Sequence, residues 1–413
     1  MTPIKQATRK QKIIGLKGII TLITLVNMII PLSTDLYLPA MPSMTTTFQT
    51  SSALINMTLT LFFLFLGLGT LVCGPLSDKY GRKPVLLVGN LLYIVSSFAC
   101  ASAVNINLLI VFRIFQAIGA GACVAVTMAI VKDCFYGKLR DKILALIQTV
   151  SVLAPIIAPV LGAFVLKYTT WNMLFVILAI FAIIFFVLTI LYTETLTKNN
   201  RTKDNVLNSL GRLIVVCKNV KFTYLLIIFS LLAAPFMGYL TIASYIYIDM
   251  FGLSKQGFSY YFAVNALFSV LGPIIYVNLL NKISAKNFTI ISFISVLFFS
   301  LLLFFTGSKS AMIFFLLFIP IAIGFSSTRP LCASILFKQQ KQDSGSVSSL
   351  ISSGNTLFGC LGMFCVSIPF LSLTQRLATV AIVSSVLSLI LFLILLKNYK
   401  FIPGIKEIES QLK

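Results

Sequence analysis

Asp35 is the residue of this chain with the clearest capacity for proton chemistry, because it lies inside a long apolar run at residues 15–41. The other acidic residues lie at or beyond the ends of such runs. A carboxylate within an apolar span is costly unless it is protonated or paired, so it marks a functional site by default. Burial favours the protonated form, and Asp35 is therefore expected to take up and release protons. Alternatively, Asp35 caps a kink between Pro31 and Pro39.

Arg113 and Arg329 are the two basic residues well inside apolar runs. Arginine stays protonated, so each must face a cavity or bind polar groups. Arg113 is expected either to hold Asp35 as an anion until substrate or proton arrives, or to bridge carbonyl groups of a neighbouring helix with help from Gln116. For Arg329 two interpretations stay open. Its side chain faces a cavity, or it extends towards the cytoplasmic headgroups.

Polar residues inside apolar runs are candidates for the lining of a substrate cavity. With 36 phenylalanines and 14 tyrosines, such a cavity would be apolar, with few fixed polar groups, which suits recognition of many apolar or cationic compounds. Each residue taken alone is also explained by a contact between helices. The candidates for substrate binding are Tyr37, Asn56, Gln116, Tyr239, Tyr245, Asn265 and Asn355.

The composition excludes a water-soluble protein. Of the 413 residues, 58% are apolar and only 10% are charged, whereas a soluble domain carries about 25% charged residues. A spanning helix needs about 20 residues, so the chain has room for roughly twelve spans with short loops. We therefore predict an all-α membrane protein with twelve transmembrane helices. They are expected near residues 15–41, 52–75, 85–104, 107–131, 143–166, 172–193, 222–248, 257–280, 288–306, 311–337, 345–371 and 377–396.

The residue types also argue against a metal site, a cofactor or an enzyme. Histidine is absent, which removes imidazole ligands and histidine bases. The eight cysteines form no CxxC pair, and most lie in apolar runs, where cysteine is a small packing residue. We therefore expect no cofactor.

The basic residues predict the orientation in the membrane. The formal net charge is +22, and of the 32 lysines and arginines only four lie on the side of the spans opposite both termini. They are Lys167, Lys255, Lys309 and Arg376. The positive-inside rule then places both termini in the cytoplasm of a plasma (inner) membrane. The positive charge is expected to face anionic lipid and not nucleic acid.

A polar interval at residues 198–221 divides the spans into two groups of six. We predict an N-terminal six-helix bundle at 1–197, this cytoplasmic loop, and a C-terminal bundle at 222–413 with a short tail. Residues 74–83 align weakly with residues 277–286, and both segments follow the second span of their half. Two pseudo-symmetric six-helix bundles of this kind are a transporter architecture.

The string GPLSDKYGRK at 74–83 resembles the signature loop of the major facilitator superfamily, G-x-L-x-D-[RK]-x-G-R-[RK]. Three further segments resemble elements of that family. Residues 113–121 resemble its R-x-x-Q-G-x-G element. Residues 158–163 resemble the antiporter motif G-P-x-x-G-G, with alanine at the first and last positions. Residues 34–40, TDLYLPA, are similar to the T-D-x-Y-L-P-A stretch of the bicyclomycin-resistance (Bcr/CflA) type of drug:proton antiporter.

The resemblance implies a proton-coupled transporter that exports small hydrophobic or cationic compounds by alternating access. The alternatives are an exporter dedicated to one metabolite, such as a siderophore, and an importer of organic anions. The expected partners are a small-molecule substrate, protons and membrane lipid, and we expect a monomer. Asp35 and Arg113 are the expected proton-coupling residues. The expected gating residues are Gly74, Asp78, Gly81, Arg82, Lys83, Pro159 and Gly162.

Overall fold

The structure is a computed structural model that describes residues 13–197, 199, 201–202, 211, 213, 215–279, 282–340, 344–399, 402–403 and 405. All regular structure in these residues is helical. Twelve helical stretches are long and apolar enough to cross a membrane. The prediction of an all-α protein with twelve transmembrane helices is thus confirmed. Much of the expected central loop and C-terminal tail lies outside the described residues.

The chain forms two compact units. Unit 1 comprises Met1–Ala40, Thr46–Thr50 and Leu61–Ser209. Unit 2 comprises Met41–Thr45, Ser51–Thr60 and Leu210–Lys413. Two short segments from the first and second helical stretches therefore belong to the unit that is otherwise built from the second half of the chain. The sequence did not predict that these two segments belong to unit 2.

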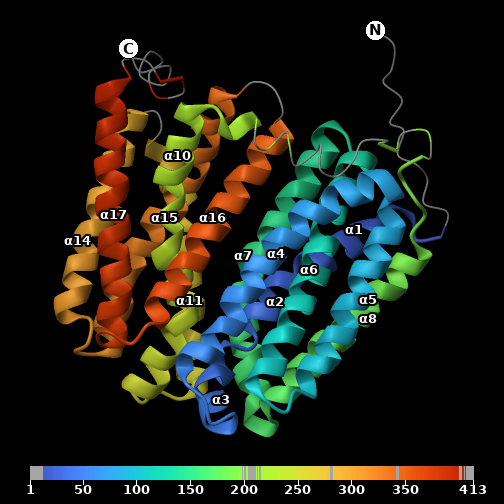
Figure 1. Ribbon diagram of the computed structural model, residues 1–413, viewed down its shortest axis with the longest axis horizontal. Helices are drawn as coiled ribbons and strands as arrows, with labels where there is room; N and C mark the ends of the chain where they lie inside the picture. Colours follow the sequence, from blue (N-terminus) through green and yellow to red (C-terminus); the bar gives the residue numbers. More distant parts are fainter. Residues whose placement is uncertain are drawn as a thin grey trace. The chain divides into compact units, whose positions relative to one another are not determined.

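Unit 1 contains the helix that carries Asp35 and most of the other helices of the first half of the chain (Figure 1). They are α1 (Gly15–Asn27), α2 (Ile29–Asp35), the 3-10 turn η1 (Leu38–Ala40), most of α4 (Ser52–Tyr80), α5 (Arg82–Ala101), α6 (Ile106–Cys134), α7 (Gly137–Tyr168) and α8 (Trp171–Leu191). Helices α5 and α6 pack closely because Gly119 carries no side chain. A Cβ atom at Gly119 would lie 2.6 Å from the Gly89 carbonyl oxygen and 2.7 Å from the Tyr93 nitrogen.

Unit 2 contains the remaining helices (Figure 1). They are most of α3 (Met41–Thr47), α10 (Val220–Ser230), α11 (Ala233–Ser244), the π-helical turn η3 (Tyr245–Met250), α12 (Lys255–Ser269), α13 (Leu271–Leu279), α14 (Ala285–Thr306), α15 (Ala311–Gln339), α16 (Ser344–Ser367) and α17 (Leu373–Asn398). Helix α11 packs against α16, and α14 packs against α15 and α17. At the first of these contacts, Gly362 lies directly against the backbone of Ala234.

Three of the predicted spans, 15–41, 222–248 and 257–280, contain a helix break shortly before a proline, and these breaks have the same cause. Pro31, Pro235 and Pro273 each occupy the third position of the second helix, in α2, α11 and α13. Proline has no N–H to donate to the carbonyl four residues earlier, so the first helix ends and a new one begins just before it.

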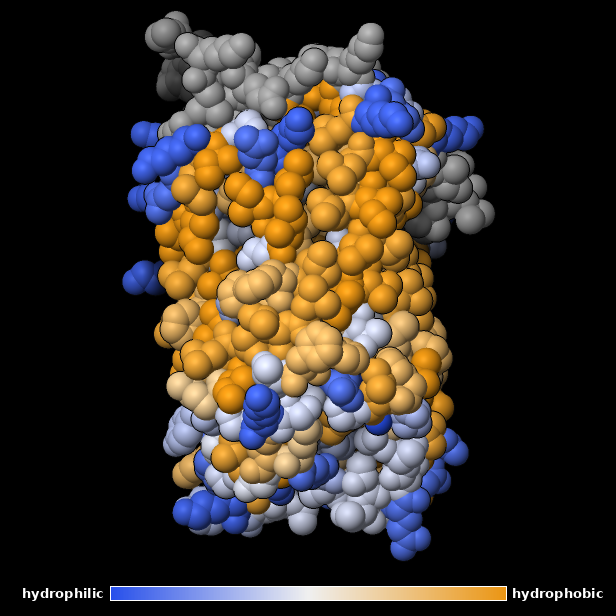
Figure 2. All heavy atoms as spheres, turned by 90° about the vertical axis from the view of Figure 1, so that its left-hand side faces the viewer, coloured by the Kyte–Doolittle hydropathy of each residue, from blue (hydrophilic) through white to orange (hydrophobic). Residues whose placement is uncertain are grey.

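The outer surface of unit 2 has the hydropathy expected of a membrane protein. Figure 2 shows the face formed by α14 and α17, where a broad hydrophobic band separates two hydrophilic ends. Exposed apolar residues of these two helices include Ile294 and Phe298 on α14, and Leu387 and Ile390 on α17. Such side chains match the hydrocarbon region of a bilayer.

Candidate functional site

Asp35 lies at the C-terminal end of α2 and is only 4% exposed. Its Oδ1 atom accepts a hydrogen bond of 2.8 Å from the Thr34 hydroxyl. Among the described residues no basic group forms an ion pair with it. An isolated buried carboxylate is strongly disfavoured, so this environment stabilises the protonated form of Asp35.

Arg113, on α6, is fully buried and binds a polar network of unit 1. Its Nη1 atom donates to the Ser33 carbonyl oxygen at 3.0 Å and to Oε1 of Gln116 at 2.8 Å. Gln116 in turn donates to the Ser97 hydroxyl at 2.8 Å. The Ser33 hydroxyl bonds the Tyr93 hydroxyl at 2.6 Å. The network thus joins α2, α5 and α6 beside Asp35.

Three aromatic rings complete the surroundings of Arg113. Its Cζ atom lies 4.2 Å from the ring centre of Phe62, 5.3 Å from that of Tyr37 and 5.6 Å from that of Phe175. Cation–π contacts of this kind stabilise a charge that has left water. The Nε and Nη2 atoms of Arg113 have no hydrogen-bond partner among the described residues, so their three N–H groups stay available.

The expected ion pair between Arg113 and Asp35 is not formed. Arg113 instead bridges the Ser33 carbonyl and Gln116, which is the structural alternative that the sequence left open. The physical reason is that hydrogen bonds to a main-chain carbonyl and to an amide oxygen offset much of the desolvation free energy of the buried guanidinium, so no counter-ion is needed. The structure also brings Tyr37 and Gln116 to this site.

The candidate gating residues of α7 lie against the turn that follows Asp35. Gly162 is so close to this turn that an added Cβ atom would overlap the Leu36 carbonyl oxygen. Pro159, less than one helical turn earlier, lies within α7 and is buried. The partial antiporter motif of the sequence is therefore packed directly against the Asp35 segment, since Leu36 is its next residue.

The signature loop forms an ionic network at one end of unit 1. Arg82 donates to Asp78 at 2.6 Å, to Asp133 at 2.9 Å and to the Ser77 hydroxyl at 2.7 Å. Gly81 has a φ angle of 106°, which favours glycine. Gly74 has open space around its Cα atom, with nothing within 4 Å of an added Cβ atom.

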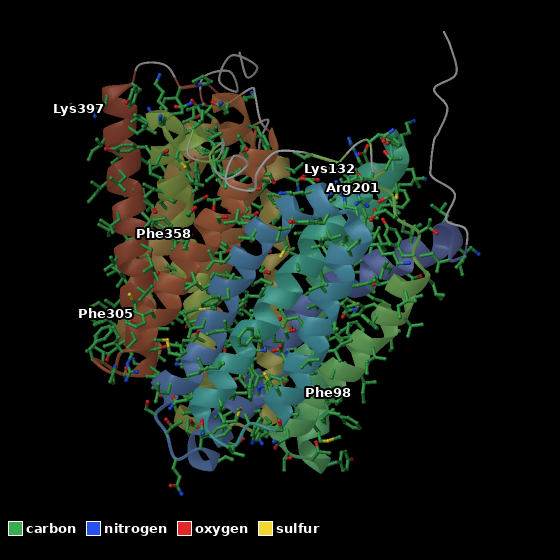
Figure 3. The ribbon with its side chains drawn as sticks, turned by 45° about the vertical axis from the view of Figure 1, so that its right-hand side comes forward. Phe98, Lys132, Arg201, Phe305, Phe358 and Lys397 are labelled. Atoms are coloured by element: carbon green, nitrogen blue, oxygen red, sulfur yellow. The ribbon has the colours of Figure 1, made fainter. Side chains whose placement is uncertain are left out.

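Glu194 is a functional candidate that the sequence analysis missed. Its carboxylate accepts hydrogen bonds from the backbone N–H groups of Arg82 and Lys83, both at 3.1 Å, and so caps the N-terminus of α5. It also lies 4.0 Å from Arg201. Figure 3 shows Arg201 and Lys132 at the same end of unit 1, with Phe98 towards the opposite end. The signal in the sequence was an acidic residue directly after an apolar span.

Further contacts tie the segment after α8 to the signature loop. The Thr202 N–H donates to the Asp78 carbonyl oxygen at 3.1 Å. The Lys83 ammonium donates to the Ile190 carbonyl oxygen at 2.6 Å. The buried Tyr192 hydroxyl bonds Thr195 at 2.6 Å, and burial raises the pKa of Tyr192, so that it stays neutral. The signature loop is therefore hydrogen-bonded both to the end of α8 and to the segment that follows this helix.

Of the five remaining substrate-binding candidates, Tyr239 and Asn265 are buried in unit 2, and Tyr239 lies in an aromatic region. The Tyr239 ring stacks on Phe318 with ring centres 4.0 Å apart and on Phe262 at 5.8 Å. The hydroxyls of Tyr239 and Tyr247 are neighbours, but neither has a partner with hydrogen-bond geometry in the described part of the chain. The amide nitrogen of buried Asn265 is also unpaired there. Unit 2 thus holds buried polar groups with unused bonding capacity.

The other three candidates of unit 2 have different surroundings. Asn56 donates to the Ser367 hydroxyl at 3.0 Å, which matches a contact between helices. Asn355 is half-buried on α16. Tyr245 makes a long 3.5 Å hydrogen bond to the Met41 carbonyl oxygen. It also lines a cavity of about 390 Å³ together with residues that include Asp249 and Arg376.

The comparisons with known proteins agree on one family. Residues 23–363 match the family described as Major Facilitator Superfamily. The chain is 34% identical over 167 residues to a chloramphenicol resistance protein of Pseudomonas aeruginosa, covering 40% of each chain. It is 24% identical over 269 residues to a bicyclomycin resistance protein homolog of Haemophilus influenzae, covering 64% of this chain and 66% of the relative. The matched part thus spans less than two thirds of either relative.

The fold resembles that of solved transporter structures. A mutant of the peptide transporter POT in complex with alafosfalin superposes with a TM-score of 0.75 at 15% identity, covering 99% of this chain and 98% of the other. At this level of identity the similarity shows the fold alone.

Proposed function

Because the chain belongs to the Major Facilitator Superfamily, and is thus a multi-pass membrane transporter and not an enzyme, we propose that it exports small hydrophobic or cationic compounds in exchange for protons. The distribution of basic residues supports an orientation with both termini in the cytoplasm. Export is supported by the names of two relatives, which refer to resistance against two different compounds, chloramphenicol and bicyclomycin.

The observation that carries the proton-coupling proposal is the setting of Asp35. It is a buried carboxyl group with one hydrogen bond and no ion pair among the described residues, and it lies next to the Gly162 contact of α7. A group that is neutral here and ionised in a wetter conformation binds protons in one state and releases them in the other. That difference links the protonation of Asp35 to the conformational equilibrium.

Arg113 gives this linkage a second element. Its Nε and Nη2 groups have no partner among the described residues, while Asp35 accepts from Thr34. When Asp35 loses its proton, these N–H groups could compensate the new charge after a local shift, because Arg113 is bound to Ser33, two residues before Asp35. We infer that a cycle of pairing and release between Asp35 and Arg113 accompanies transport.

The test is proton release from purified protein in vesicles. Addition of chloramphenicol to wild type should release protons, whereas Asp35→Asn should release none, since its side chain holds no titratable proton. Asp141→Asn is the matched control, because it removes an exposed acid near the N-terminal end of α7 that belongs to no candidate site. Proton-driven accumulation of chloramphenicol that persists in Asp35→Asn would contradict the proposal.

A further inference from the structure

Arg329 is a charged residue that the proposed transport mechanism does not use. It belongs to α15, four residues after the midpoint of this 29-residue helix. Its side chain is exposed, and among the described residues it has neither a hydrogen bond nor an ion pair. An accessible, unpaired guanidinium within a spanning helix requires water or a ligand beside it.

The direction of the side chain excludes the interpretation in which Arg329 reaches for lipid headgroups. Its Cζ atom lies 5.8 Å from the ring centre of Phe325. Phe325 is one turn closer to the N-terminal end of α15, at the midpoint of the helix. The guanidinium therefore points towards the middle of the span and away from the nearer helix end at Gln339. A side chain that snorkelled to the surface would lean the other way.

The face of α15 that carries Arg329 is not the lipid-facing one. Phe318, Phe325 and Arg329 follow one another at i, i+7 and i+11, which places them on one side of a helix. Phe318 stacks on Tyr239, and Phe325 stacks on Phe236 of α11 at 4.7 Å. The exposed apolar residues of α15 follow a different stripe, with Met312, Leu316 and Phe337. The exposure of Arg329 is consequently exposure to water inside the span.

A second helix of unit 2 shows the same pattern. On α16, Ser348 and Ser352 are exposed and Asn355 is half-buried, and their spacing of four and three residues places them on one face. The exposed apolar residues Leu357 and Leu361 lie on the opposite side of this helix. Because polar side chains are not placed against lipid, this stripe also faces water.

Helices α15 and α16 hold no acid that could neutralise Arg329. Residues 250–342 and 344–406 contain no aspartate or glutamate, and both helices lie entirely within these two ranges. A lone guanidinium with five N–H donors binds a planar carboxylate in two places at once. An anionic group on a ligand is therefore the partner that fits.

We propose that Arg329 is an anion subsite in unit 2, which binds the carboxylate of amphipathic compounds while the neighbouring aromatic rings contact their apolar part. This proposal rests on the proposed export function, which it extends from hydrophobic and cationic compounds to those that carry a negative charge. The nearest ring is that of Phe325, which is buried, and it stacks on the half-buried ring of Phe236. Phe236 is therefore the ring that a ligand would contact.

The experiment compares two probes that share one ring system and differ at the carboxyl group, which is anionic in one and a neutral ester in the other. Nalidixic acid and its neutral ethyl ester are titrated at pH 8 against the full chain in phosphatidylcholine vesicles, which contain no anionic lipid. The variants are Arg329→Gln, Arg329→Lys and the control Lys397→Gln, which removes a charge from the exposed end of α17 (Figure 3). Wild type should bind the acid more tightly than the ester. Arg329→Gln should weaken acid binding about tenfold, the equivalent of one charge-assisted hydrogen bond, and leave ester binding unchanged.

Arg329→Lys should retain part of the preference, because it keeps the charge but not the bidentate geometry. The proposal is overturned if Arg329→Gln binds the acid as wild type does, if it loses acid and ester binding equally, or if Lys397→Gln loses the preference too. Chloramphenicol export is measured on the same variants. Because chloramphenicol is uncharged, export that continues in Arg329→Gln leaves the proposed function intact whatever the acid titration shows.

Discussion

Unit 1 and unit 2 both bury polar side chains, but they treat them differently. In unit 1, hydrogen bonds link Ser33, Tyr93, Arg113, Gln116 and Ser97 into one network. In the described part of unit 2, a buried polar atom without a partner occurs in each of the side chains of Tyr239, Tyr247, Asn265, Ser230 and Ser244. Buried polar groups without partners are costly. The unit 1 network also leaves Nε and Nη2 of Arg113 unpaired, and these are the groups proposed to pair with Asp35. The unpaired groups of unit 2 suit binding of a ligand or water.

The two intramembrane arginines show the contrast most directly. Arg113 is fully buried, with two acceptors and three aromatic neighbours. Arg329 is exposed, with one ring at 5.8 Å. An arginine side chain is therefore bound to neighbouring groups in unit 1, whereas in unit 2 it is accessible and is proposed to bind a ligand.

The largest effect is expected from Arg113→Ala. This change leaves the Ser33 carbonyl and Gln116 without their donor, at a cost of about 2–4 kcal/mol in the free energy of unfolding. Transport should be lost as well. Thermal unfolding of purified protein measures the first effect. Arg329→Ala is the comparison, and its unfolding midpoint should stay close to wild type. Equal destabilisation by both changes would remove the distinction between the two units.

The next effect is expected from Gly162→Ala. An added Cβ atom overlaps the Leu36 carbonyl oxygen, so the turn after Asp35 must shift. Proton-driven export should fall about tenfold or more, because misplacing a catalytic or coupling group by about 1 Å has effects of that order or larger. Gly345→Ala, near the start of α16, is the control, since no described atom lies within 4 Å of its added Cβ atom and it is not a gating candidate. If both variants export equally well, the α7 contact does not position Asp35.

The signature loop and its counterpart in unit 2 offer a third comparison. Glu194→Gln weakens two charge-assisted hydrogen bonds to the N-terminus of α5, which are each worth about 1 kcal/mol at such a position. Asp78→Asn removes one of the partners of Arg82. Both changes should slow export several-fold and leave drug affinity unchanged, because the loop lies at the end of unit 1. Lys282→Gln, in the segment that aligns with this loop, should have little effect. Loss of drug affinity in Asp78→Asn would contradict the gating role.

The twelve spans could be predicted because apolar composition alone decides whether a helix crosses a bilayer. The breaks at Pro31, Pro235 and Pro273 are visible in the sequence as prolines, but prolines also lie inside the unbroken helices α4, α7 and α15. Which proline ends a helix depends on how its surroundings satisfy the freed backbone groups. The domain boundary at residues 198–221 and the orientation of the termini stay predictions.

Within the candidate site, the sequence could predict mainly the charged residues, because they are rare inside spans. Asp35 and Arg113 stand out because charges are rare within spans. The partners of Arg113 do not, because one is the main-chain carbonyl of Ser33, and every residue has a carbonyl. The cap formed by Glu194 is equally hidden, since its two donors lie 112 and 111 positions away in the chain. A single sequence reports which groups need partners and does not report which partner the fold supplies.

The smallest effect is expected from removing single tyrosine hydroxyls, and it separates the two units most finely. Tyr93→Phe in unit 1 breaks the 2.6 Å bond to the Ser33 hydroxyl and should cost about 1 kcal/mol. Tyr239→Phe in unit 2 removes a hydroxyl that has no partner among the described residues, so stability should be unchanged or slightly higher. Drug binding should show the reverse, with the larger effect at Tyr239. Tyr239→Phe should bind a ligand that uses the unpaired hydroxyl several-fold more weakly, whereas Tyr93→Phe should bind it as wild type does. Unfolding midpoints and drug titrations on the same preparations measure both quantities. If Tyr239→Phe is as destabilised as Tyr93→Phe and binds drugs normally, the Tyr239 hydroxyl is a structural group, and the contrast between the units fails at this position.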